Sequence, residues 1–230
     1  MPTLLLTGAN RGLGLEFTRQ YRDAGWRVYA CCRAPDRATE LQALAAASNG
    51  RVSVHALDVA DHPRIAALAQ ELRGVALDVL LNNAGIYGPR DGSFGHIDYR
   101  AWADVFAVNT MAPMRMAECF VEHVARSDRK IIACLTSLMG SVTENSGGHY
   151  PYRSSKAALN MVVRGLSIDL RPRGIIAVVV HPGWVQTDMG GREAPMQAPD
   201  SIRGMRGVFD RLRPEDSGKF LNHDGSEIPW

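Results

Sequence analysis

The chain has 230 residues, of which 46% are hydrophobic and 22% are charged. This length and composition suit a single domain, residues 1–230, that buries roughly 70 to 75% of its unfolded surface, and they exclude a disordered or collagen-like protein. The 26 basic and 24 acidic residues leave a net charge of +2. Because this balance gives no electrostatic footprint for nucleic acid, we expect no nucleic-acid partner.

The four cysteines include an adjacent pair and no CxxC spacing, so they predict neither a zinc site nor a redox dithiol. The seven histidines are scattered, without an HxxxH or a carboxylate at ligand spacing, so no metal is expected. No charged start followed by an apolar stretch opens the sequence, and apolar runs such as residues 175–180 are far below the ~18 residues of a membrane helix. We therefore expect a soluble, cytoplasmic protein with buried free thiols and no membrane partner.

Short apolar runs alternate with amphipathic segments along the chain. The runs predict strands at residues 4–6, 28–31, 52–57, 79–81, 131–135 and 175–180. Most are apolar almost throughout, as in a parallel sheet that is covered on both faces. The segments between them have apolar residues at helical spacing, in stripes over residues 13–24, 65–72 and 158–166. This alternation predicts an α/β fold with a doubly wound sheet built from right-handed crossovers.

Two stretches break this rhythm, residues 86–96 and 188–206, and both contain several glycines and at least one proline. They predict loops over the carboxyl edge of the sheet, where doubly wound folds bind ligands. The second stretch is further predicted to close over the substrate as a lid.

The sequence TGANRGLG, residues 7–14, directly follows the first predicted strand. Gly8 permits a tight turn, Gly12 lets a pyrophosphate approach the backbone, and Gly14 lets the next helix pack closely on the sheet. The helix start then offers free N–H groups to phosphate. Taken alone, the glycines could merely end a strand and begin a helix, so the motif gains its meaning from its position.

A dinucleotide site of this type usually has an acid near the end of the second strand, where it hydrogen-bonds the adenosine ribose. Here that strand ends in Cys32 and Arg33. Arg33 can pair with a 2′-phosphate, and Arg11 in the glycine loop can supply a second positive charge. These residues favour NADP(H) over NAD(H); the alternative is that both are solvated surface arginines in an arginine-rich chain.

Tyr152 and Lys156 lie four residues apart at the start of the third apolar stripe, so on a helix both side chains project from one face. Lysine is scarce, with three in the whole chain. A free tyrosine has a pKa of ~10, and a charged lysine ~4 Å away would bring it close to neutral pH. The pair therefore predicts proton transfer; the alternative is a tyrosine that anchors a helix start.

The order of the motifs resembles that of the short-chain dehydrogenase/reductase family. They are TGANRGLG, NNAG at residues 82–85, Asn109, Ser137, YRSSK at residues 152–156 and HPGWVQT at residues 181–187. The likeness covers nearly all of the chain and is greatest to the carbonyl reductase and C-factor-like branch. It implies a Rossmann fold whose seven-stranded parallel sheet has the order 3-2-1-4-5-6-7, with helices on both faces.

The resemblance also assigns catalytic roles. Tyr152 is implied as the general acid of carbonyl reduction, or the general base of the reverse reaction, with Lys156 beside it. Ser137 is implied to polarise the substrate carbonyl. Its separation from Tyr152 is two residues longer than usual and Ser141 lies nearby, but Ser137 directly follows the fifth strand and is preferred.

Asn109 completes the implied catalytic set. Pro113 has no N–H for the Asn109 carbonyl oxygen, which the resemblance implies holds a water leading to the lysine; a plain proline kink is the alternative. Asp58 is implied to contact the adenine and Thr187 the nicotinamide carboxamide, although Asp58 could instead cap a helix. The predicted cofactor-binding residues are Gly8, Asn10, Arg11, Gly12, Leu13, Gly14, Arg33, Asp58, Val59, Asn83, Ala84, Gly85, Tyr152, Lys156, Pro182, Gly183, Val185 and Thr187.

We therefore predict an NADP(H)-dependent oxidoreductase that moves a hydride between nicotinamide and the carbonyl or alcohol carbon of a small molecule. The alternative is a regulatory or signalling protein of C-factor-like type that binds NADP(H) without catalysis. The predicted substrate lining is apolar and aromatic and consists of Tyr87, Met139, Trp184 and Met189. Family habit implies a homodimer or homotetramer. The apolar residues Ile228 and Trp230 are predicted to tuck against the body of the protein or a neighbouring subunit.

Overall fold

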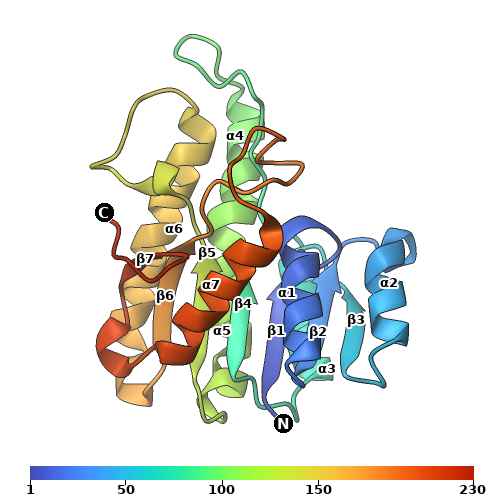
Figure 1. Cartoon of the computed structure of the whole chain (residues 1–230). Coiled ribbons are helices and arrows are strands. Elements are labelled where there is room, and N and C mark those ends of the chain that lie inside the picture. Colours follow the sequence, from blue (N-terminus) through green and yellow to red (C-terminus); the bar gives the residue numbers. More distant parts are fainter.

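The computed structural model describes residues 1–230 and contains one sheet of seven strands (Figure 1). The strands are β1 (Thr3–Thr7), β2 (Arg27–Cys32), β3 (Val52–Ala56), β4 (Val79–Asn82), β5 (Ile131–Leu135), β6 (Ile176–His181) and β7 (Phe220–Asn222). Their order across the sheet is β3-β2-β1-β4-β5-β6-β7, and every neighbouring pair is parallel. The predicted architecture and strand order are confirmed.

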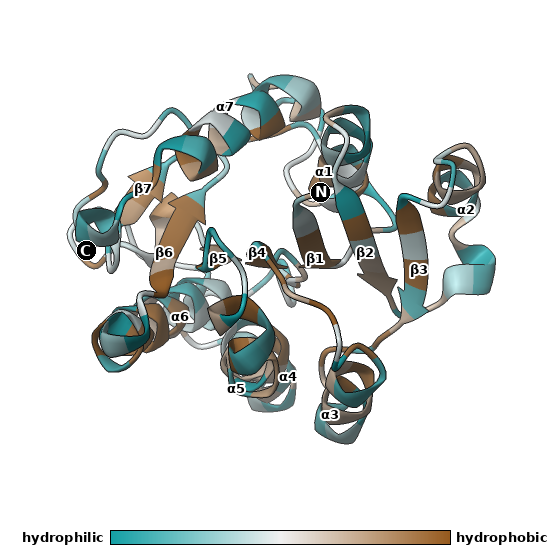
Figure 2. Cartoon of the chain, turned by 90° about the horizontal axis from the view of Figure 1, so that it is seen from below, coloured by the Kyte–Doolittle hydropathy of each residue, from teal (hydrophilic) through white to brown (hydrophobic).

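Helices cover both faces of the sheet (Figure 2). One face carries α1 (Gly12–Asp23), α2 (Thr39–Ala46) and α7 (Ala198–Arg211). The other carries α3 (His62–Glu71), α4 (Tyr99–Phe106), α5 (Ala112–Ala125) and α6 (Tyr150–Asp169). Single helical turns lie at Pro35–Arg37, Leu138–Gly140, Arg171–Arg173 and Pro214–Asp216, and a π-helical turn, Ala107–Met111, joins α4 to α5. None of the helices combines the length and the apolar character that crossing a membrane demands.

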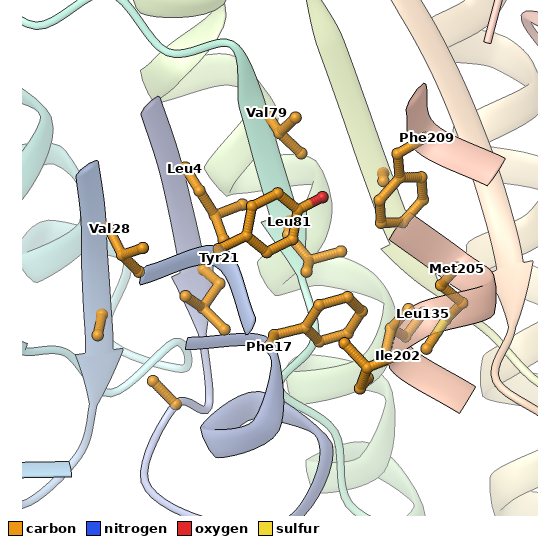
Figure 3. Packing of buried hydrophobic residues seen from close by; sticks show 14 of the residues in the cluster. Leu4, Phe17, Tyr21, Val28, Val79, Leu81, Leu135, Ile202, Met205 and Phe209 are labelled. Atoms are coloured by element: carbon orange, nitrogen blue, oxygen red, sulfur yellow. The ribbon is translucent and has the colours of Figure 1, made fainter. Parts of the chain in front are cut away.

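The strands divide the hydrophobic core into two layers. Successive strand residues point to opposite faces, so Leu4 and Leu6 of β1 pack with α1, α2 and α7, whereas Leu5 packs with α3, α5 and α6. In the first layer, the rings of Phe17 in α1 and Phe209 in α7 lie 6.4 Å apart between centroids (Figure 3). A sheet that buries both faces in this way needs the continuous apolar runs that the sequence shows.

The prediction of a loop over residues 188–206 is wrong for its last part, which belongs to α7. Pro199 lies in the first turn of this helix, where a missing N–H breaks no intrahelical hydrogen bond. Gly204 faces the chain beyond β7, and a Cβ at this position would come within 2.6 Å of the His223 carbonyl oxygen. The glycine allows close packing, and its low helix propensity conceals the helix in the sequence pattern.

Besides α7, the elements α2, α4, α5 and β7 have no counterpart among the strands and helical stripes predicted from residue patterns. Of these, α2 and β7 are short, with eight and three residues. The predicted loop at residues 86–96 contains no helix or strand. All four cysteines are free; Cys31, Cys32 and Cys134 are buried as expected, and Cys119 is half-buried.

Candidate active site

The carboxyl ends of β1 to β6 meet at one cleft with a volume of about 540 Å³. A doubly wound sheet binds its ligands at this edge. The cleft is lined by most of the predicted cofactor-binding residues, namely Gly8, Asn10, Arg11, Gly12, Leu13, Gly14, Arg33, Asp58, Val59, Asn83, Ala84, Gly85, Tyr152, Lys156, Pro182 and Thr187. Gly183 and Val185 do not line it, because both pack against Met196 instead.

The glycine loop has the backbone geometry that a phosphate-binding turn requires. Gly8 and Gly12 have φ angles of +70° and +51°, which L side chains rarely adopt. A Cβ on Gly14 would collide with the Gly8 carbonyl oxygen, so this position admits only glycine. The first turn of α1 receives no side-chain hydrogen bond from its N-cap residue, Arg11. This loop therefore fits a pyrophosphate held on backbone N–H groups.

Three arginines line the same cleft, Arg11, Arg33 and Arg37. Arg33 follows β2 directly and Arg37 lies in the next helical turn. Arg37 is absent from the predicted set, although a second arginine four residues after Arg33 was a usable signal. Arg11 forms an exposed ion pair with Asp188 across the cleft, with 2.8 Å between Nη1 and Oδ2. The cationic side chains suit a phosphate on the adenosine ribose.

Asp58 lines the cleft after β3, and its carboxylate accepts a hydrogen bond from the Ala60 N–H at 3.0 Å. The N-cap of α3 is Asp61, whose Oδ1 accepts from the Arg64 N–H at 3.0 Å. The helix-cap alternative for Asp58 is therefore wrong, and its side chain lies at the cleft beside Val59.

Tyr152 and Lys156 lie one turn apart near the start of α6, and both side chains reach the cleft. Both residues are buried, with 8% and 5% of their surface exposed. The Lys156 Nζ lies 5.7 Å from the centre of the Tyr152 ring and donates a hydrogen bond to the Leu135 carbonyl oxygen at 2.8 Å. The end of β5 therefore fixes the ammonium group beside the phenol.

Burial raises the pKa of the Tyr152 phenol to about 12, while a hydrogen bond with Ser137 acts in the opposite direction. Burial also lowers the pKa of Lys156 to about 8. The expectation that the tyrosine titrates near neutral pH is wrong for this structure, because desolvation of the phenolate outweighs the hydrogen bond with Ser137. At neutral pH the phenol is protonated and the lysine is mostly charged.

Two serines follow β5, and their contacts separate their roles. Ser137 caps the turn Leu138–Gly140, where its Oγ accepts from the Met139 N–H at 3.2 Å, and it also interacts with the Tyr152 phenol. The Ser141 hydroxyl instead donates to the Pro229 carbonyl oxygen at 2.7 Å. The geometry thus favours Ser137 as the serine that meets a substrate carbonyl next to Tyr152.

Asn109 is fully buried in the π-helical turn that precedes α5. Its side-chain amide donates to the Ile86 carbonyl oxygen at 2.8 Å and to the Ser155 hydroxyl at 3.0 Å, and its Oδ1 accepts from the Ile86 N–H at 2.9 Å. Pro113 follows in the first turn of α5, so the backbone leaves α-helical geometry where the kink was expected. Asn109 thereby connects Ile86, in the loop that follows β4, to Ser155 of α6, which lies between Tyr152 and Lys156 in the sequence.

Comparison with known proteins places this geometry in a family. The family model described as short chain dehydrogenase matches residues 2–198. The chain belongs to the short-chain dehydrogenase family.

Three similar proteins illustrate its place there. C-signal of Myxococcus xanthus is 48% identical over 155 residues, which are 67% of this chain and 93% of that protein. The carbonyl reductase Sniffer of D. melanogaster superposes with a TM-score of 0.95 at 32% identity over 100% of both chains. The NADPH-bound carbonyl reductase from chicken fatty liver gives a TM-score of 0.91 at 35% identity, covering 100% of this chain and 94% of that one.

Aromatic side chains lie beside Tyr152 in this short-chain dehydrogenase. The Tyr87 ring stacks on the Tyr152 ring, with centroids 4.5 Å apart and planes inclined by 26°. Its hydroxyl lies 4.0 Å from the Met139 sulfur. Met189 lines the cleft, whereas the exposed Trp184 donates from its indole to the Gly190 carbonyl oxygen at 2.8 Å. Tyr87 thus stacks on Tyr152 and contacts Met139; Tyr87 and Met139 are two of the residues predicted to line the substrate site.

Several residues of this short-chain dehydrogenase line the cleft without having been predicted to bind the cofactor. Most are apolar, so no side-chain pattern distinguishes them in the sequence. Besides Arg37, they are Cys32, Ala34, Leu57, Ile86, Val108, Leu135, Thr136, Asp188 and Met189, of which Met189 was predicted to line the substrate site instead.

Proposed function

We propose that this chain is an NADP(H)-dependent oxidoreductase that transfers a hydride between nicotinamide and the carbonyl or alcohol carbon of a small molecule. The observation that carries the proposal is the pair of Tyr152 and Lys156, buried one helical turn apart in the cleft that the glycine loop also lines. A protein that only bound a nucleotide would need no acid–base pair at this position.

The preference for NADP(H) rests on charge. Arg11, Arg33 and Arg37 line the cleft, and no acid occupies the position after β2 that usually binds the ribose hydroxyls of NAD(H). The similar chicken carbonyl reductase is described as NADPH-bound. When bound, the nicotinamide would supply or accept the hydride.

The protein side chains supply the proton and the polarisation. At neutral pH Tyr152 holds its proton, which is the form that can donate to a carbonyl oxygen as a hydride arrives at the carbon. Ser137 donates a hydrogen bond to the same oxygen and stabilises its developing negative charge. Lys156, held by the Leu135 carbonyl, stabilises the phenolate that remains and can contact the nicotinamide ribose.

Tyr152→Phe tests the mechanism directly. Removal of the general acid should lower kcat by roughly 10² to 10⁴-fold and leave the Kd for NADPH within about twofold, because the ring still packs against Tyr87. Steady-state NADPH oxidation and fluorescence titration measure the two quantities. Tyr150→Phe, an exposed neighbour in the same helix, is the matched control and should behave as the wild type. Undiminished turnover of Tyr152→Phe would contradict the mechanism.

A second function, signalling through nucleotide occupancy, is favoured by one comparison, the 48% identity to C-signal. The two functions separate in one assay, in which NADPH oxidation is followed with a panel of aldehydes, ketones and quinones. The oxidoreductase proposal expects turnover with members of this panel. Tight NADPH binding without turnover across the whole panel would favour the signalling protein.

A further inference from the structure

The last residues of the sequence fold back along β7. The N–H of Ile228 donates to the Phe220 carbonyl oxygen at 2.8 Å, and Leu221 forms an antiparallel bridge with Glu227. Ile228 is 8% exposed and belongs to the second core layer, and the Trp230 ring lies 5.6 Å from that of Phe220. Of the two predicted alternatives, packing against the body of the same chain is therefore the one observed. This route brings residues 229 and 230 to the segment that follows β5 (Figure 1).

Ser141 is the centre of that contact. Its hydroxyl lies 2.7 Å from the Pro229 carbonyl oxygen and 3.1 Å from that of Trp230, and it accepts from the Glu144 N–H at 3.1 Å. The Thr143 N–H donates to the Trp230 carbonyl oxygen at 3.0 Å. Ser141 is 2% exposed, so these hydrogen bonds are shielded from water.

Backbone hydrogen bonds connect Ser141 to Ser137, one of the proposed catalytic residues. Ser141 directly follows the turn Leu138–Gly140, and its N–H donates to the Leu138 carbonyl oxygen at 2.9 Å. Ser137 begins the same turn, and its carbonyl oxygen accepts from the Gly140 N–H at 2.8 Å. Two hydrogen bonds of one short turn therefore connect the backbone of Ser141 to that of Ser137, and misplacement of a catalytic group by about 1 Å can cost roughly 10²-fold in rate.

The opposite side of this turn rests on α6. A Cβ on Gly140 would come within 2.8 Å of the Lys156 Cβ, and the Gly140 carbonyl oxygen accepts from the Asn160 amide at 3.2 Å. The turn that carries Ser137 is therefore held between the helix of the catalytic tyrosine and lysine on one side and residues 229–230 on the other. The connection from Ser137 to Tyr152 is long, so local chain geometry alone does not fix their spacing.

We propose that Ser141 and the Pro229–Trp230 segment position the Ser137 hydroxyl against Tyr152, so that losing their contact slows hydride transfer while NADP(H) binding stays intact. This proposal rests on the proposed oxidoreductase function. It assigns Ser141 and Trp230 as positioning residues that act through Ser137.

A double-mutant cycle between Ser137 and Ser141 tests this coupling. Single-turnover NADPH oxidation is measured for the wild type, Ser137→Ala, Ser141→Ala and the double variant, with the best carbonyl compound of the panel. We expect Ser141→Ala to slow hydride transfer by about tenfold or more, since small displacements of catalytic groups are costly, and to leave the Kd for NADPH within twofold. In the Ser137→Ala background the same substitution should have little further effect. An equal loss in both backgrounds, or no loss in either, would overturn the proposal.

Further variants and a structural readout complete the test. Ser141→Thr keeps the hydroxyl and should restore most of the rate. Deletion of Pro229 and Trp230, which removes both main-chain acceptor oxygens, should reproduce the defect of Ser141→Ala. Amide hydrogen exchange at Leu138–Gly140 should quicken in Ser141→Ala. If the wild type turns over no carbonyl compound, the proposed function fails, and unchanged exchange at these amides would then independently refute the positioning role.

Discussion

At the residue scale, one lysine should set the upper limit of the working pH. Burial lowers the pKa of Lys156 to about 8 and raises that of Tyr152 to about 12. As pH rises through 8 the lysine loses its charge while the phenol keeps its proton. We expect kcat/KM for NADPH, which reports ionisations of the free enzyme, to be level below about pH 8 and to fall about tenfold per pH unit above it.

Substitution of Lys156 tests whether this residue causes the fall in kcat/KM above about pH 8. Lys156→Arg keeps a positive charge at all accessible pH values, so any activity it retains should show no decline near pH 8. A wild-type profile that stays level to pH 10 would contradict the lowered lysine pKa.

The arginines of the cleft make a second prediction at this scale. Arg33→Ala and Arg37→Ala should each weaken NADPH binding by roughly tenfold or more, because each loses a charge-assisted hydrogen bond to phosphate. NADH lacks the 2′-phosphate, so its Kd should change little. Titrations with both nucleotides give the comparison, and Arg203→Ala on the exposed side of α7 serves as the control. Equal losses for both nucleotides would refute a specific phosphate contact.

At the scale of elements, substitution of Gly165 in α6 and of Gly204 in α7 should have opposite effects on stability. A Cβ at Gly204 would come within 2.6 Å of the His223 carbonyl oxygen, whereas one at Gly165 meets nothing within 4 Å. Gly204→Ala should lower the free energy of unfolding by about 1–3 kcal/mol through overpacking. Gly165→Ala should raise it by up to about 1 kcal/mol through helix propensity. Urea denaturation measures both free energies of unfolding. A higher free energy of unfolding for Gly204→Ala would contradict the prediction, because it would mean that α7 can move away from His223.

The sequence predicts the elements that follow a simple period and misses those that depend on neighbours. Six strands are visible as apolar runs because both faces of the sheet are buried. The start of α7 is hidden because Pro199 and Gly204, which read as loop residues, have roles set by the helix start and by His223. The spacing of Tyr152 and Lys156 can be read from the sequence. The pKa of Tyr152 cannot, since the desolvation that raises it depends on how the folded chain packs around the phenol.

At the scale of the whole molecule, nucleotide binding should stabilise the fold, since the cleft draws residues from six strand ends. NADPH at 100 times its Kd should add about 2.7 kcal/mol to the free energy of unfolding, which corresponds to a rise in Tm of roughly 5–11 °C for a chain of this size. Thermal unfolding monitored by circular dichroism measures the shift. An unchanged Tm at saturating NADPH would be incompatible with binding to the native state alone.

The sheet separates two kinds of mutational effect. α1 continues the glycine loop and packs through Phe17 in one layer, whereas α6 carries the proposed catalytic pair and packs through Leu159 and Val163 in the other. A cavity at Phe17 should therefore impair nucleotide affinity first, and one at Val163 should impair turnover first. Since the sheet lies between the two layers, a defect in the packing of one layer should leave most of the packing of the other undisturbed.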